Sequence, residues 1–317
     1  MARRAKKGKA RQSRKTAIAS FNAAKVKSDI ERRLRAKGIG RREAAVLEQR
    51  APIAHVLKKV RERKKAGEAR GYFRTGVPGF DELLEHGVPR QSAVLVAGGA
   101  GSGKTILCLE ILAKAAARGE RCLYMSFEES EERLRQHMED FGWEPEKLVR
   151  SGKLVLKRFN PFDITRSVEA LLEKSKGELL IDVEPIILPD GFRPDIIALD
   201  SLTAVASAFT GKEDSYRIYI EQLFRFFERI GATSFLITET KQIPTVFSSS
   251  GVEEFLADGV IVLYSIKRGN IRENALEVLK MRGEQHQKRI VAMQIVGGKG
   301  VVVYPEQEIF GGVEAER

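Results

Sequence analysis

The 317-residue chain has little cysteine and no long apolar segment. Its only two cysteines, Cys108 and Cys122, stand among apolar residues, which is typical of small core side chains in a reducing compartment rather than of a disulfide framework. No apolar run approaches the roughly 20 residues that a membrane-spanning helix needs. No apolar segment follows the basic N-terminus as in a secretory signal. We therefore expect a cytoplasmic protein with no membrane-spanning helix.

Acidic and aromatic residues are scarce in the N-terminal part of the chain. The first 28 residues contain no acid, and the first 70 contain one aromatic residue, Phe21. Residues 1–70 hold 24 Lys and Arg against 6 Asp and Glu, a net +18, whereas the remainder carries −6. Clustered cations of this kind favour binding to nucleic-acid phosphates. The alternatives are a solubilising tail, adventitious binding to rRNA through charge alone, contact with the protein's own acidic patches, and a transit peptide over residues 1–27.

The same shift in composition predicts two domains. We expect residues 1–72 to form a basic N-terminal region that is partly disordered, because like charges repel, and partly helical. The helices are predicted at 28–38, after a capping-box pattern, and at 52–65, where a proline precedes an apolar stripe. Residues 73–317 are predicted to form the second domain.

From residue 93 onward, short apolar strands alternate with helix-length segments. We expect strands at 93–97, 123–127, 154–156, 196–199 and 234–238, and helices at 104–118, 131–141, 167–175 and 215–230, with an irregular stretch at 177–194. Such alternation indicates an α/β fold with a mostly parallel sheet and helices on both faces. Strands with short links follow at 260–266, 275–281, 291–296 and 301–304. They predict a C-terminal extension of antiparallel hairpins.

A glycine-rich motif connects the first of these strands to the first helix. It fits G-x-x-x-x-G-K-[ST] and consists of Gly98, Gly99, Ala100, Gly101, Ser102, Gly103, Lys104 and Thr105. In such a loop the backbone N–H groups wrap phosphates, the lysine reaches the β- and γ-phosphates, and the Thr105 hydroxyl binds Mg²⁺. The motif therefore predicts a nucleotide site of the Walker A type.

Two further strand ends carry acids that phosphoryl-transfer chemistry needs. Asp200 ends an apolar strand and is predicted to hold Mg²⁺, although an acid there could also cap a loop. Glu128 and Glu129 follow another strand, and a carboxylate at that edge can deprotonate the attacking water. Alternatively, both glutamates belong to an acidic helix start, where they favour the helix dipole.

Several motifs recur in order beyond the P-loop. They occupy residues 75–84, 87–90, 126–129, 141–143, 251–255, 258, 279–283 and 286. Together they resemble the KaiC-like branch of the RecA-type ATPases, in the form found in archaeal proteins with a single KaiC domain. The resemblance covers about residues 73–312.

This resemblance implies a RecA-like ATPase that forms rings, commonly hexamers, with ATP and Mg²⁺ between subunits. It assigns Glu128 and Glu129 as the catalytic pair and Lys280 and Arg282 as a K-x-R pair that reaches the neighbour's ATP. Read without the family, Lys280 and Arg282 are solvated residues on one face of a strand. The clock protein has two such domains, and its phosphorylated positions correspond here to Glu254 and Phe255, so we expect no autokinase activity.

Two other functions fit the same core. A RadA-like recombinase or recombination mediator would share the P-loop, and residues 34–47 faintly resemble a DNA-binding helix–hairpin–helix, with an F-x-x-A pattern at 21–24. A regulator that uses ATP only as an assembly ligand would carry the same binding motifs. The expected function is therefore a ring-forming, Mg²⁺-dependent ATPase with a regulatory or nucleic-acid-linked role.

Overall fold

The computed structural model describes residues 71–166, 188–189, 191–244, 246–248, 250–268 and 270–309. The basic region 1–70, with its expected helices at 28–38 and 52–65, lies outside the described residues. The same is true of the helix expected at 167–175 and of most of the stretch 177–194. Among the described residues, no helix is both long and apolar enough to cross a membrane.

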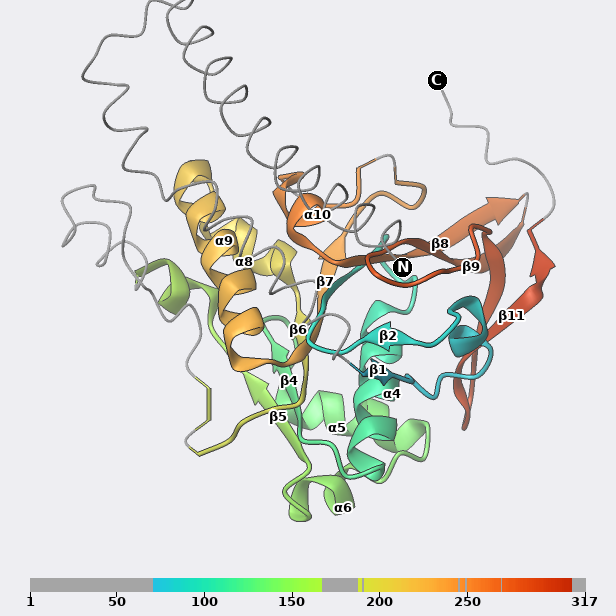
Figure 1. Cartoon of the computed structure of the whole chain (residues 1–317), viewed down its shortest axis with the longest axis horizontal. Coiled ribbons are helices and arrows are strands. Elements are labelled where there is room, and N and C mark those ends of the chain that lie inside the picture. The colour runs from blue at the N-terminus through green and yellow to red at the C-terminus, as the bar shows by residue number, and fades with distance from the viewer. Residues whose placement is uncertain are drawn as a thin grey trace, which may run out of the picture. The chain divides into compact units, whose positions relative to one another are not determined.

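A nine-stranded sheet forms the centre of the described part of the chain, in the order β11-β10-β9-β8-β3-β7-β6-β4-β5 (Figure 1). Six strands run parallel: β3 (Ala93–Gly98), β4 (Cys122–Ser126), β5 (Leu154–Arg158), β6 (Ile196–Asp200), β7 (Thr233–Glu239) and β8 (Gly259–Arg268). The sheet continues antiparallel through β9 (Ile271–Met281), β10 (Val291–Val296) and β11 (Gly300–Glu308). The expected parallel sheet with an antiparallel hairpin extension is confirmed.

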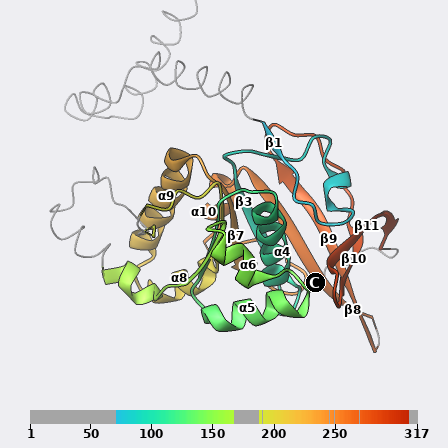
Figure 2. The ribbon, with the colours of Figure 1, turned by 90° about the horizontal axis from the view of Figure 1, so that it is seen from below.

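Helices cover both faces of this sheet, as Figure 2 shows. One face carries α4 (Lys104–Ala117), α5 (Glu131–Asp140) and α6 (Pro145–Arg150), and the other carries α8 (Leu202–Ala208), α9 (Glu213–Ile230) and α10 (Val252–Leu256). The strands supply both cores because their side chains alternate: Val94 packs into the first cluster and Leu95 into the second. The helices α6, α8 and α10 were not predicted, since each is too short to show a helical period.

A small second sheet lies before the P-loop strand. Its strands β1 (Tyr72–Phe73) and β2 (Val88–Pro89) pair antiparallel, and the short helix η1 (Phe80–Leu83) lies between them in the chain. The Asp81 carboxylate closes this segment by accepting hydrogen bonds from the backbone N–H groups of Thr75 and Gly76.

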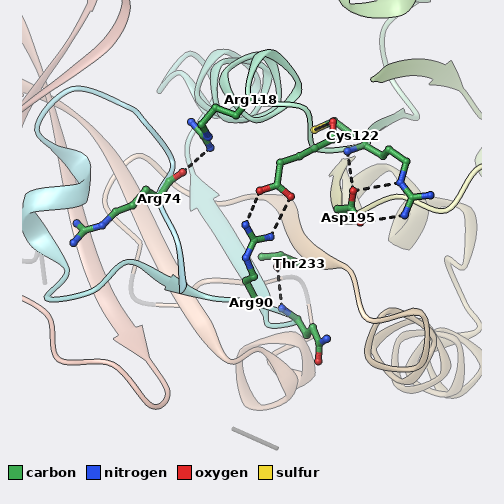
Figure 3. Close-up of polar contacts among 9 residues, drawn as sticks. Arg74, Arg90, Arg118, Cys122, Asp195 and Thr233 are labelled. Atoms are coloured by element: carbon green, nitrogen blue, oxygen red, sulfur yellow. Dashed lines mark hydrogen bonds and ion pairs between the residues drawn. The ribbon is translucent and has the colours of Figure 1, made fainter. Parts of the chain in front are cut away.

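Polar contacts hold together the amino ends of the parallel strands (Figure 3). The Arg90 guanidinium, just before β3, donates two hydrogen bonds to Glu120, just before β4. Arg121 pairs with Asp195 in the same way at the start of β6. These contacts tie together the amino ends of the strands. Ligands of open α/β sheets bind at the opposite, carboxyl ends, where loops can form a site.

A buried carboxylate connects the helix α4 to the C-terminal hairpin. Glu110 is 0% exposed, and its Oε2 accepts a hydrogen bond of 2.6 Å from the backbone N–H of Val301 on β11. Its Oε1 accepts a 2.6 Å hydrogen bond from the Lys114 ammonium. Burial raises the pKa of Glu110, and its two hydrogen-bond donors oppose that rise.

Replacing Glu110 with Ala should destabilise the fold, because it leaves the buried Val301 N–H without a partner. We expect the free energy of unfolding to fall by about 1–3 kcal/mol, measured by urea denaturation. Glu146→Ala is the matched control, since Glu146 pairs with Arg135 on the surface, where such pairs contribute little. Equal stability of the two variants would show that the Glu110 contact does not anchor the hairpin.

Candidate active site

The glycine-rich loop lies at the carboxyl edge of the sheet, between β3 and α4. The strand β3 is buried along its whole length and sits between β7 and β8. The helix α4 begins at Lys104, directly after Gly103, so its free N–H groups open onto the loop. A helix start of this kind attracts anions such as phosphate.

Close packing restricts several glycines of the loop, among them Gly99 and Gly103. Gly103 has a φ of 96°, and a Cβ at this position would lie 2.7 Å from Cδ1 of Ile295 on β10. At Gly99 a Cβ would come within 2.8 Å of the Gln242 side chain. Any larger residue at either position would displace the loop or its neighbours.

Lys104 is held inside the loop. The residue is only 7% exposed, and its ammonium donates a 3.0 Å hydrogen bond to the Gly99 carbonyl. Its Nζ also lies 4.0 Å from Oε1 of Glu239, at the end of β7. Burial lowers the pKa of Lys104, whereas the nearby carboxylates of Glu239, Asp200 and Glu128 oppose the shift.

Asp200 lies next to the P-loop, at the end of β6. Its Oδ2 accepts two hydrogen bonds, one of 2.8 Å from the Thr105 hydroxyl and one of 2.7 Å from the Tyr124 hydroxyl. The residue is 4% exposed, and burial raises the pKa of its carboxyl while these two donors lower it. The peptide bond between Asp200 and Ser201 is cis.

The donor set around Asp200 fits Mg²⁺ held together with a nucleotide. Thr105 and Asp200 offer hard oxygen atoms, which Mg²⁺ prefers. Within the described ranges, no group of three or more His, Cys, Asp or Glu side chains could hold a metal by itself. Mg²⁺ is commonly held by one or two protein ligands together with substrate phosphates and water, and Thr105 and Asp200 could supply those protein ligands.

The adjacent glutamates Glu128 and Glu129 point to different partners. Oε1 of Glu128 accepts a 2.5 Å hydrogen bond from the Ser201 hydroxyl, next to Asp200. The Glu129 carboxylate instead lies 2.9 Å from Nε2 of His137 and 3.4 Å from Nε of Arg133, both on α5. Only Glu128 of the pair therefore faces the edge that carries Lys104 and Asp200.

Lys280 and Arg282 lie at the end of β9, against the short helix α10. The Lys280 ammonium donates to the carbonyls of Glu254 and Ala257, at 2.9 and 2.7 Å. The Arg282 guanidinium donates to the Phe255 carbonyl at 2.8 Å. Among the described residues, neither side chain makes a hydrogen bond or ion pair with the P-loop of its own chain.

Four residues that were not predicted as site residues from the sequence also contribute to this edge. Tyr124, Ser201 and Glu239 contact Asp200, Glu128 and Lys104, as described above. Gln242 donates a 3.1 Å hydrogen bond to the Ala100 carbonyl of the loop. A signal existed for Ser201 and Glu239, since each lies at the carboxyl end of a predicted strand, but nothing in the local pattern indicates Tyr124 or Gln242.

Comparison of the sequence with known proteins identifies a family and several relatives. The family model described as "ATPase: KaiC" matches residues 73–308. A UPF0273 protein of Pyrococcus horikoshii is 32% identical, in an alignment that covers 75% of this chain and 96% of that protein. The circadian clock protein KaiC3 of Synechocystis is 34% identical over 73% of this chain and 45% of its own length. The chain thus spans less than half of the clock proteins that it matches.

A solved structure shows the same fold. The crystal structure of a KaiC-like protein from Pyrococcus horikoshii OT3 aligns with a TM-score of 0.61 and 30% sequence identity. The alignment covers 74% of this chain and all of that protein.

Proposed function

The chain belongs to the KaiC family of ATPases, and from that premise we propose that it hydrolyses ATP with Mg²⁺ at the subunit interfaces of a ring, commonly a hexamer. The observation that carries this proposal is the contact between the P-loop and β6, where the Thr105 hydroxyl bonds Asp200 at 2.8 Å. It joins the P-loop to a metal-side acid, and Ser201, the residue after that acid, bonds the carboxylate of Glu128 at the same edge of the sheet.

Each side chain at this edge has a role that its contacts support. The N–H groups at the start of α4 bind the phosphates, and Lys104 turns from the Gly99 carbonyl toward them. Thr105 and Asp200 would hold the Mg²⁺ ion, which neutralises charge on the β- and γ-phosphates when bound. Glu128 takes the proton of the attacking water, because its carboxylate is the member of the glutamate pair that faces Asp200.

The two glutamates should differ in their importance for hydrolysis. Glu128→Gln should lower kcat by about 10²- to 10⁴-fold while ATP binding persists, since a positioned base contributes that much. Glu129→Gln should have a much smaller effect, because Glu129 pairs with α5. Phosphate release at saturating ATP measures turnover, and binding of a fluorescent ADP analogue measures affinity, with Lys104→Ala as the variant that loses binding. A loss in Glu129→Gln as large as that in Glu128→Gln would contradict this assignment.

In this proposal, a second subunit supplies cations in addition to Lys104. Among the described residues of this edge, Lys104 is the cation of the loop, and the acids Asp200, Glu239 and Glu128 lie near it. Lys280 and Arg282 lie at the end of β9 instead, beside Phe255, which is 79% exposed. We propose that Lys280 and Arg282 of one copy reach the ATP of the next, where they stabilise charge that develops during transfer.

Mixing two inactive variants tests this role in trans. Arg282→Ala and Glu128→Gln should each be inactive alone, whereas mixed rings should regain activity, since some interfaces then pair an intact Arg282 with an intact Glu128. Phosphate release is measured after the two proteins are mixed, with subunit exchange verified by mass spectrometry. Arg217→Ala, which removes an exposed arginine of α9, is the control and should remain active. Rings that are shown to be mixed and yet stay inactive would reject the role in trans.

We further propose that residues 1–70 bind nucleic-acid backbones. The net +18 of this segment, set against −6 for the rest of the chain, supports binding through phosphates. The single aromatic residue in the segment limits base stacking, so discrimination for single strands should be weak. Such binding would connect the ATPase to DNA or RNA.

Deletion of residues 1–70 should abolish DNA and RNA binding and leave basal ATP hydrolysis largely intact. In the full chain, log K should fall with log salt by about 0.9 for each duplex phosphate neutralised. Fluorescence anisotropy with labelled duplex and single strands measures both effects, and deletion of residues 1–27 alone should give an intermediate loss. If the protein without residues 1–70 binds as tightly as the full chain, the nucleic-acid site lies in the core, as a recombinase would require.

A further inference from the structure

The Ser201 hydroxyl makes two hydrogen bonds at the carboxyl end of β6. The residue is 0% exposed and is the N-cap of α8, where its Oγ accepts a 3.1 Å hydrogen bond from the Ala204 N–H. A hydroxyl that accepts through its oxygen keeps its one proton for another partner. Here that partner is Oε1 of Glu128, at 2.5 Å. The cap therefore fixes the Ser201 hydroxyl, and the hydroxyl in turn fixes a carboxylate oxygen.

The backbone on both sides of this contact is also held in place. The strands β4 and β6 pair directly, with Ser126 opposite Asp200. The Phe127 N–H donates a 2.6 Å hydrogen bond to the Asp200 carbonyl, which extends the pairing by one residue. The Ser126 hydroxyl accepts from the N–H groups of Glu128 and Glu129, at 3.3 and 2.8 Å. Glu128 thus leaves a strand end whose position relative to Ser201 is set by the sheet.

We propose that Ser201 is a positioning residue for Glu128. This inference rests on the proposed role of Glu128 as the base. By bonding Oε1, Ser201 leaves Oε2 of the carboxylate to accept the proton of the attacking water. Asp200 and Ser201 are consecutive, so one strand end orients both the metal-side acid and the base. Glu129 has no such support, because its partners lie on α5.

Replacing Ser201 with Ala in the full chain should lower kcat by about 10- to 100-fold, a part of what a general base contributes. The Kd for ATP should stay within about twofold of the parent, since Ser201 does not belong to the phosphate-binding loop. Ser201→Thr keeps the hydroxyl and should restore most of the turnover. Ser130→Ala is the matched control: it removes the N-cap of α5, whose hydroxyl accepts from the Arg133 N–H, and should leave kcat unchanged.

A double substitution separates positioning from structural damage. If Ser201 acts through Glu128, Ser201→Ala should cause no further loss in the Glu128→Gln background, whereas a structural role would lower single-turnover rates again. Ser201→Cys, which is nearly isosteric but a weak donor, gives the same readout if the alanine variant does not fold. If Ser201→Ala turns over ATP like the parent while Glu128→Gln is inactive, the positioning role of Ser201 is wrong and the proposed base stands. Parent-like turnover of Glu128→Gln overturns the proposed base and this inference with it.

Discussion

The hydrogen bond between Thr105 and Asp200 is the contact on which the organisation of the site depends. It joins the start of the helix α4 to the end of β6, although β7 separates β6 from the P-loop strand. A buried carboxylate is costly unless hydrogen bonds compensate it, and Asp200 receives a second one from Tyr124. Three segments far apart in the chain are thereby held at one edge of the sheet.

The acids at this edge differ in what surrounds them, and the roles that we propose for them rest on that difference. Asp200 is buried between two hydroxyl donors, Glu239 lies beside the Lys104 ammonium, and Glu128 is bonded to Ser201. Glu129 is adjacent to Glu128 in sequence, yet its carboxylate contacts Arg133 near the start of α5 and His137 in the last turn of the same helix. The chain bends beyond the end of β4, so the two neighbouring carboxylates reach different partners, Ser201 for Glu128 and α5 for Glu129.

The antiparallel part of the sheet also supports the nucleotide loop. Ile295 on β10 packs against Gly103, and Val301 on β11 donates to Glu110 in the middle of α4. At the end of β9, Lys280 and Arg282 donate hydrogen bonds to the backbone carbonyls of α10. The C-terminal hairpins therefore brace the P-loop helix of their own chain and present Lys280 and Arg282 away from it.

Elements with a local signal could be predicted from the amino-acid sequence alone. The alternation of apolar strands and long helices predicted the parallel sheet and its hairpin extension, because both depend on periodicity within a few residues. The P-loop residues from Gly98 to Thr105 and the strand-end acid Asp200 were likewise visible, since their spacing along the chain is itself the signal.

The side chains that meet across the sheet could not be predicted in this way, because they come together only in the folded chain. The strand order brings Tyr124 and Ser201 to their carboxylates from 76 and 73 residues away, and Gln242 to the P-loop from 142 residues away. It also gives the carboxylates of Glu128 and Glu129 different partners and places Arg282 against α10. The physical reason is that these contacts arise from strand pairing and packing between distant segments, which leave no pattern in the residues on either side.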